Sequence, residues 1–174
     1  MPLTSLDHAL VEAAIPLALL DEAAAEGSLW AVLDLCDAPA ALAKFVELGD
    51  ARAIPLYRGT PQEPLWDIGP CLVRANGDLL AWIQEVMWLE PWGVLLVAHG
   101  EADTLAAHLR SLLVVDAPNG EQWNFRYYDP RVLPTYLRTC TQAELDEFFG
   151  PVRKYVTSVG PEDVRSFARI APSA

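Results

Sequence analysis

Apolar residues are spaced along this chain in patterns that predict alternating strands and helices. Two short, almost continuously apolar runs, Leu29–Leu35 and Trp92–Ala98, are typical of strands covered on both faces of a sheet. Apolar residues at helical spacing predict helices over Leu17–Glu26, Ala40–Leu48 and Ala102–Leu112. Because strands and helices alternate, we expect an α/β fold with a mixed β-sheet flanked by helices.

The two ends of the chain are both predicted to be helical. Thr4 can cap a first helix that runs to about Ala14. Apolar residues at every third position predict one short helix in the C-terminal part, namely Val164, Phe167 and Ile170. We expect residues 1–152 to form an α/β domain and residues 153–174 to be a short C-terminal extension of the same domain.

Turn and capping residues mark other boundaries. Residues 59–70 hold three prolines and two glycines, which favour a loop. The sequence PNG lies between two short stretches, Leu113–Asp116 and Gln122–Tyr128, and is suited to a hairpin turn. Thr141, followed three residues later by Glu144, is the capping-box pattern that begins a helix.

The chain contains six tryptophans, and tryptophan is enriched at the centres of protein interfaces. Trp66, Trp88 and Trp92 lie around loop-like segments, so they are candidate partner-binding residues. The other three lie in predicted strands or helices and are expected in the core, namely Trp30, Trp82 and Trp123.

The most distinctive segment is Asn124–Leu133, with the sequence NFRYYDPRVL. Arg126, Asp129 and Arg131 form a charged group at a predicted strand-to-helix junction. Either arginine could donate two parallel hydrogen bonds to a nearby carboxylate. Asp129 can cap a helix that begins at Pro130. We favour a structural brace here, and a ligand site stays open as the alternative.

Acidic residues outnumber basic ones by 24 to 12, which gives a net charge of −12. Phosphate backbones and anionic membranes repel such a field, so we expect binding to neither nucleic acid nor membrane. Residues 1–50 carry nine acidic residues and one basic residue, whereas residues 122–174 carry six and seven. The acidic front is either a solubility device, which we favour, or a docking face for a basic partner.

Motifs for catalysis, cofactors or metals are not recognised in the sequence. There is no glycine-rich phosphate loop and no acidic or histidine cluster with metal-ligand spacing. The three cysteines are widely spaced and odd in number, which argues against a disulfide framework and a zinc site. His99 could pair with Cys71 or Asp103, but no catalytic motif supports this, so we expect no enzyme, cofactor or metal.

The N-terminus lacks a basic residue before an apolar stretch, so it does not predict a secretory signal. No apolar run approaches the ~20 residues that cross a bilayer. We therefore expect a soluble, reduced, cytoplasmic protein.

Several motifs of this chain occur in the order in which a known family has them. They are LWAVLD (29–34), GPCLVR (69–74), WGVLLVA (92–98), LAAHLRSLL (105–113), FRYYDPRVLPTYL (125–137) and EFFGPV (147–152). Together they resemble the bacterial type VI secretion effector adaptors, also called Tap or TEC chaperones (VasW-like). Many members continue into a longer helical C-terminal lobe, so the resemblance implies a short version.

This resemblance implies a cytosolic adaptor that binds a toxic effector and helps to load it on the VgrG spike. A co-adaptor or a second copy of the chain is a further partner that the resemblance leaves open. We take the exposed-looking aromatic residues and the charged junction as the partner-binding candidates, namely Trp66, Trp88, Trp92, Arg126, Tyr128, Asp129 and Arg131.

Two other classes of protein stay open. An immunity-like inhibitor could use the acidic front against a basic toxin. A small α/β hydrolase-like enzyme could use His99.

Overall fold

A computed structural model describes residues 9–158, 160 and 164–170. Its strands are β1 (Leu10–Ile15), β2 (Leu29–Asp34), β3 (Ala53–Pro55), β4 (Pro70–Arg74), β5 (Gly93–Ala98), β6 (Val114–Asp116), β7 (Gln122–Asn124), β8 (Val152–Ser158) and β9 (Val164–Arg169). Its α-helices are α1 (Ala18–Ala25), α2 (Pro39–Leu48), α3 (Gly77–Trp82), α4 (Ala102–Ser111), α5 (Leu133–Thr139) and α6 (Gln142–Phe149). A 3-10 turn (Glu63–Leu65) and a π-helical turn (Ile83–Met87) complete the elements. None of the helices in the described ranges is long and apolar enough to cross a bilayer.

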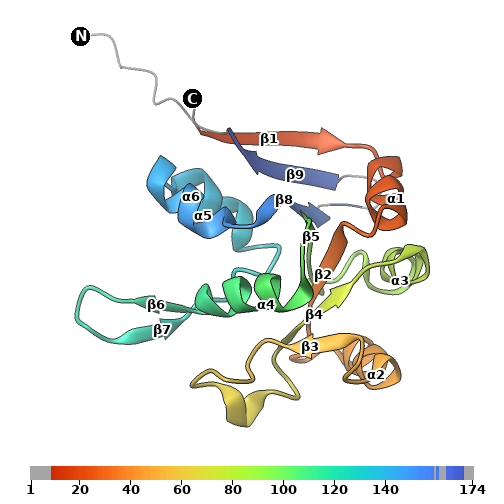
Figure 1. The fold of residues 1–174 in the computed structure, drawn as a ribbon, viewed down its shortest axis with the longest axis horizontal. Coiled ribbons are helices and arrows are strands. Elements are labelled where there is room, and N and C mark those ends of the chain that lie inside the picture. Colours follow the sequence, from red (N-terminus) through yellow and green to blue (C-terminus); the bar gives the residue numbers. More distant parts are fainter. Residues whose placement is uncertain (1–8, 159, 161–163, 171–174) are drawn as a thin grey trace.

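Seven strands form the main sheet in the order β1-β9-β8-β5-β2-β4-β3, and β6 and β7 form a separate two-stranded ribbon (Figure 1). The α/β class is confirmed. The sheet was expected to be mixed, but all pairings of the described strands are antiparallel.

Helices cover both faces of the sheet and enclose two separate cores (Figure 1). On one face α4, α5 and α6 pack against residues such as Trp30 and Val32 of β2. On the other face α1, α2 and α3 pack against the alternate residues, such as Ala31 and Leu33. Because both of its faces are covered, β2 is buried along its whole length, and its sequence is an almost continuous apolar run.

The prediction of a helical C-terminal part is wrong. Residues 152–158 and 164–169 form β8 and β9, which lie between β5 and β1 in the sheet. Tyr155 and Phe167 are paired across the two strands and enter one core, whereas Val156 and Val164 enter the other. Apolar side chains on both faces, many of them β-branched or aromatic, favour a strand over the helix that a three-residue spacing suggested.

The predicted N-terminal helix from Thr4 to about Ala14 is also wrong where it can be compared. Residues 1–8 lie outside the described residues, and Leu10–Ile15 form the edge strand β1, which pairs with β9. The first and last described strands are therefore adjacent in the sheet (Figure 1).

Gly93 allows β5 to lie close to β2. Its φ angle of +142° is rarely adopted by other residues, and a Cβ atom there would lie 1.9 Å from the carbonyl oxygen of Val32. The close approach places Trp92 beside the end of β2. The Trp92 carbonyl oxygen accepts the Asp34 N–H there at 2.8 Å.

We predict that Gly93→Ala lowers the free energy of unfolding by about 3 kcal/mol or more, because both the backbone angle and the contact with Val32 become unfavourable. Urea denaturation would measure this. Gly77→Ala is the matched control, since a Cβ atom there meets no atom within 4 Å, and its effect should not exceed ~1 kcal/mol in either direction. Equal stabilities of the two variants would contradict the prediction.

A carboxylate on β1 joins the sheet edge to its neighbours. Glu12 accepts hydrogen bonds from Arg138 of α5 at 2.6 and 2.8 Å and from Arg165 of β9 at 2.8 Å. These hydrogen bonds, first those from Arg138 and then that from Arg165, lower the pKa of Glu12 from 4.5 to about 2.

We predict that Glu12→Gln destabilises the protein at neutral pH by about 1 kcal/mol or less, since the arginines are half exposed and the pairs are screened. The folded-state pKa lies below the ordinary value, so this stabilisation is present above about pH 4.5 and is lost as the pH falls towards about 2. Urea midpoints measured across this range should converge for variant and wild type at the acidic end. Glu22→Gln, at an exposed residue with no ion pair in the described structure, should not change the pH profile.

Candidate functional site

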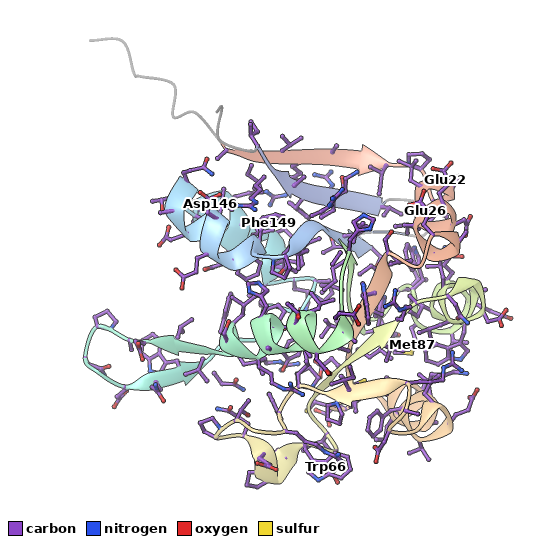
Figure 2. All side chains as sticks on the ribbon, in the orientation of Figure 1. Glu22, Glu26, Trp66, Met87, Asp146 and Phe149 are labelled. Carbon is purple, nitrogen blue, oxygen red and sulfur yellow. The ribbon has the colours of Figure 1, made fainter. Side chains whose placement is uncertain are left out.

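Two adjoining clefts lie where β2 ends. The first has a volume of about 360 Å³. It is lined by Asp34, Cys36, Asp37, Ala38, Pro39, Ala40, Val86, Met87, Glu90, Pro91, Trp92, Arg126 and Arg131. The second, of about 340 Å³, is lined by Trp88, Leu89, Glu90, Pro91, Pro130, Arg131, Ser158 and Gly160. Met87, at the end of the π-helical turn, lines the first cleft and is labelled in Figure 2.

Asp34 is the buried ionic group of the first cleft. It is the last residue of β2 and is 4% exposed. One carboxylate oxygen accepts the Cys36 N–H at 3.1 Å, and the other accepts a hydrogen bond from the Arg126 guanidinium. The Arg126 side chain remains 45% exposed, so it connects a buried carboxylate to the surface of the cleft.

Asp129 holds the second arginine. Its carboxylate accepts two side-chain hydrogen bonds from Arg131, at 2.9 and 2.7 Å, and also the Arg131 backbone N–H at 2.9 Å. These bonds from Arg131 outweigh the effect of burial and lower the pKa of Asp129. Asp129 is buried, whereas the Arg131 side chain is 69% exposed at the boundary of the two clefts.

The segment around Asp129 is a turn before the helix. The Asp129 carbonyl oxygen accepts the N–H groups of Val132 and Leu133 at 3.0 Å, and α5 begins at Leu133. The helix expected from Pro130 therefore starts three residues later. The charged residues of the junction do pair, but Arg126 pairs with Asp34 of a distant strand.

The aromatic candidates are less accessible than the sequence suggested. Trp88 and Trp92 are buried, with stacked rings 6.5 Å apart, although both line the clefts. The Trp92 Nε1 atom has no hydrogen-bond partner in the described structure. Tyr128 is also buried, its hydroxyl lies 3.2 Å from that of Tyr57, and burial raises its pKa.

Trp66 lies apart from the other candidates. It belongs to the segment between β3 and β4, at the bottom of Figure 2, and lines neither cleft. Its ring packs edge-on against Phe45 of α2 and under the Arg58 guanidinium, 4.1 Å from the ring centre. The structure thus brings Trp88, Trp92, Arg126 and Arg131 together at the clefts and leaves Trp66 outside.

Trp123 is exposed, contrary to the expectation from its strand-like segment. It was expected in the core, but it lies in the β6–β7 ribbon and is 54% exposed. The ribbon has no second layer of structure over it to bury the ring (Figure 1). The short, partly polar strands on either side of the PNG turn are the signal that could have indicated this.

The first cleft has the chemistry of a binding site for a side chain or a short peptide. Apolar groups from Ala38, Pro39 and Met87 line it, Arg126 and Arg131 supply hydrogen-bond donors, and acidic residues contribute as well. Within the described residues, no group of three or more His, Cys, Asp or Glu side chains could hold a metal ion.

The residues considered for catalysis do not form an activated pair. Cys71 is fully buried in β4, and burial raises the pKa of its thiol to about 12, which keeps it protonated. His99 is exposed at the end of β5, and its side chain makes no hydrogen bond within the described part of the chain. Asp103 lies in the first turn of α4.

We predict that Arg126→Ala destabilises the protein by about 1–2 kcal/mol, because Asp34 then stays buried without its charged partner. Combining it with Asp34→Asn should cost less than the sum of the two single changes, as expected for a coupled pair. A double-mutant cycle in urea measures the coupling. Arg153→Ala, at an exposed arginine with no ion pair among the described residues, is the control and should stay within ~0.5 kcal/mol of wild type. Strict additivity would show that the pair does not stabilise the site.

The chain is similar to a known protein family. Residues 29–147 match the family described as Domain of unknown function (DUF4123). The match runs from the first residue of β2 into α6, so it includes Asp34, Arg126 and Arg131 of the first cleft. No curated protein and no solved structure matches the chain. Because the matched region spans more than half of the sequence, the chain belongs to the DUF4123 family.

Proposed function

We propose that this protein is a cytosolic adaptor that binds a type VI secretion effector and promotes its loading on the VgrG spike. The observation that carries the proposal is the family match over residues 29–147, because DUF4123 is associated with adaptors of type VI secretion effectors. The motifs GPCLVR, WGVLLVA and FRYYDPRVL lie inside the matched region.

The architecture supports a role in binding. Two cores on opposite faces of one sheet make a stiff frame, and the clefts lie at the end of its central strands. Surfaces that are already formed bind without a large cost of ordering. A carrier must also release its cargo, and interfaces of modest area and mixed polarity suit transient complexes.

The clefts also support a non-catalytic role. Their two arginines are held by Asp34 and Asp129, which is an arrangement that presents hydrogen-bond donors to a ligand. The Cys71 thiol is protonated and buried, so it supplies no nucleophile beside His99. We therefore propose that the protein binds its partners and does not transform them.

We predict that the protein co-purifies with the effector encoded beside its gene, and that effector and VgrG associate more completely in its presence than in its absence. Arg131→Ala should weaken the effector complex about tenfold if this exposed arginine contacts the cargo, whereas the exposed Arg153→Ala should leave the affinity unchanged. Affinity purification followed by calorimetry measures both effects.

A toxicity assay in cells that express the effector with and without this protein separates an adaptor from an inhibitor. An adaptor leaves the toxicity of the free effector in place, whereas an immunity-like protein abolishes it. Failure to form a complex with either the effector or VgrG would overturn the proposed function.

A further inference from the structure

The β6–β7 ribbon stands away from the rest of the molecule. It is paired only within itself and projects from the body at the left of Figure 1. Five of its six strand residues are exposed, and the sixth, Val114, is half buried. Its base is fixed by the Phe125 N–H, which donates to the Leu113 carbonyl oxygen at 2.7 Å. The ribbon is thus anchored at its base and open along its strands.

Exposed apolar side chains are paired across this ribbon. Trp123 is 54% exposed and lies opposite Val115, which is 37% exposed. A two-stranded ribbon gains little stability from side chains that it leaves in water. Large aromatic side chains exposed in this way are typical of the residues that contribute most to binding in protein interfaces.

A groove of about 300 Å³ adjoins the ribbon at its base, where it meets α5 and α6. Aromatic rings form its apolar lining: Tyr136 lies 4.6 Å from Phe125 and 5.2 Å from Phe148, measured between ring centres. The groove is large enough for one or two apolar side chains, and its walls already pack against the core beneath α4, α5 and α6.

Every charged residue that lines this groove is acidic. The carboxylates are those of Asp116, Glu144 and Glu147, and no lysine or arginine is among the lining residues. In the described structure none of these three carboxylates forms an ion pair. A groove that combines aromatic side chains with carboxylates outside ion pairs complements a segment that carries both apolar and basic side chains.

We propose that the β6–β7 ribbon and the groove at its base form a docking surface for a partner segment with apolar and lysine or arginine side chains. Trp123 and Val115 cover one side of the segment, the aromatic groove takes an apolar side chain, and the carboxylates pair with its basic residues. This deepens the proposed adaptor function, on which it rests, by giving the chemistry of a bound partner.

The test uses the full chain and two synthetic peptides, one in which lysine alternates with leucine and one in which glutamate replaces the lysine. The lysine peptide should bind the wild-type protein, and raising the salt from about 0.1 M to about 0.5 M should weaken binding. Trp123→Ala should weaken it about tenfold, and Asp116→Lys with Glu147→Lys should weaken it further and favour the glutamate peptide. Calorimetry gives the dissociation constants, and circular dichroism checks that each variant is folded.

Matched variants elsewhere on the surface provide the controls. Val46→Ala removes another apolar side chain, which is 72% exposed on α2. Glu22→Lys with Glu26→Lys reverses two exposed carboxylates at α1, on the side away from the ribbon in Figure 2. If these controls weaken binding of the lysine peptide as much as the ribbon variants do, binding does not depend on the ribbon and its groove, and the proposal is wrong.

The outcome also separates this proposal from the proposed function. If the effector complex forms equally well with wild type and Trp123→Ala, and the lysine peptide is not bound, the adaptor function stands and the docking surface is rejected. If no effector complex forms with the wild type, the adaptor function fails and the peptide measurements alone decide the docking surface.

Discussion

A buried carboxylate at the end of β2 sets the position of the segments that follow it. Asp34 is buried at the end of β2, and a buried carboxylate is tolerated only while it is paired. Its partner, Arg126, comes from the turn after β7, so the ion pair fixes this turn against the sheet. The same turn holds Tyr128 in the core and directs the chain into α5 and α6. The pair therefore helps to position the turn that carries the second arginine and leads into the helices over one face.

Elements with strong local signals could be predicted from the sequence. Strand β2 is covered on both faces and shows the apolar run expected for that position, and α6 begins with the capping box formed by Thr141 and Glu144. The errors fall on β1, β8 and β9, whose pairings join opposite ends of the chain. Local spacing contains no information about a partner strand so far away in the sequence, and tertiary pairing overrides a weak helical pattern.

The candidate site was located only in part for the same reason. The charged residues of NFRYYDPRVL were recognised as a junction, but the carboxylate that receives Arg126 lies on a strand far earlier in the chain. Burial was inferred from the type of segment, and this was wrong for Trp88, Trp92 and Trp123. Trp88 and Trp92 lie in a non-regular segment that folds over the sheet and buries them, whereas Trp123 lies in a strand that nothing covers. A regular element therefore predicts burial only when a second layer packs on it.

Two surfaces of different chemistry lie at separate places on this frame. The cleft at the end of β2 presents Arg126 and Arg131, whereas the groove beside the ribbon presents carboxylates. In Figure 1 the ribbon projects at the left, and α2, whose first residues line the cleft, lies at the right. The adaptor function that we propose requires contact with cargo and carrier at once, so the two surfaces must not overlap. The cleft that holds the two arginines and the acidic groove have no lining residue in common, so they meet this condition, and their different chemistry disfavours exchange of their partners.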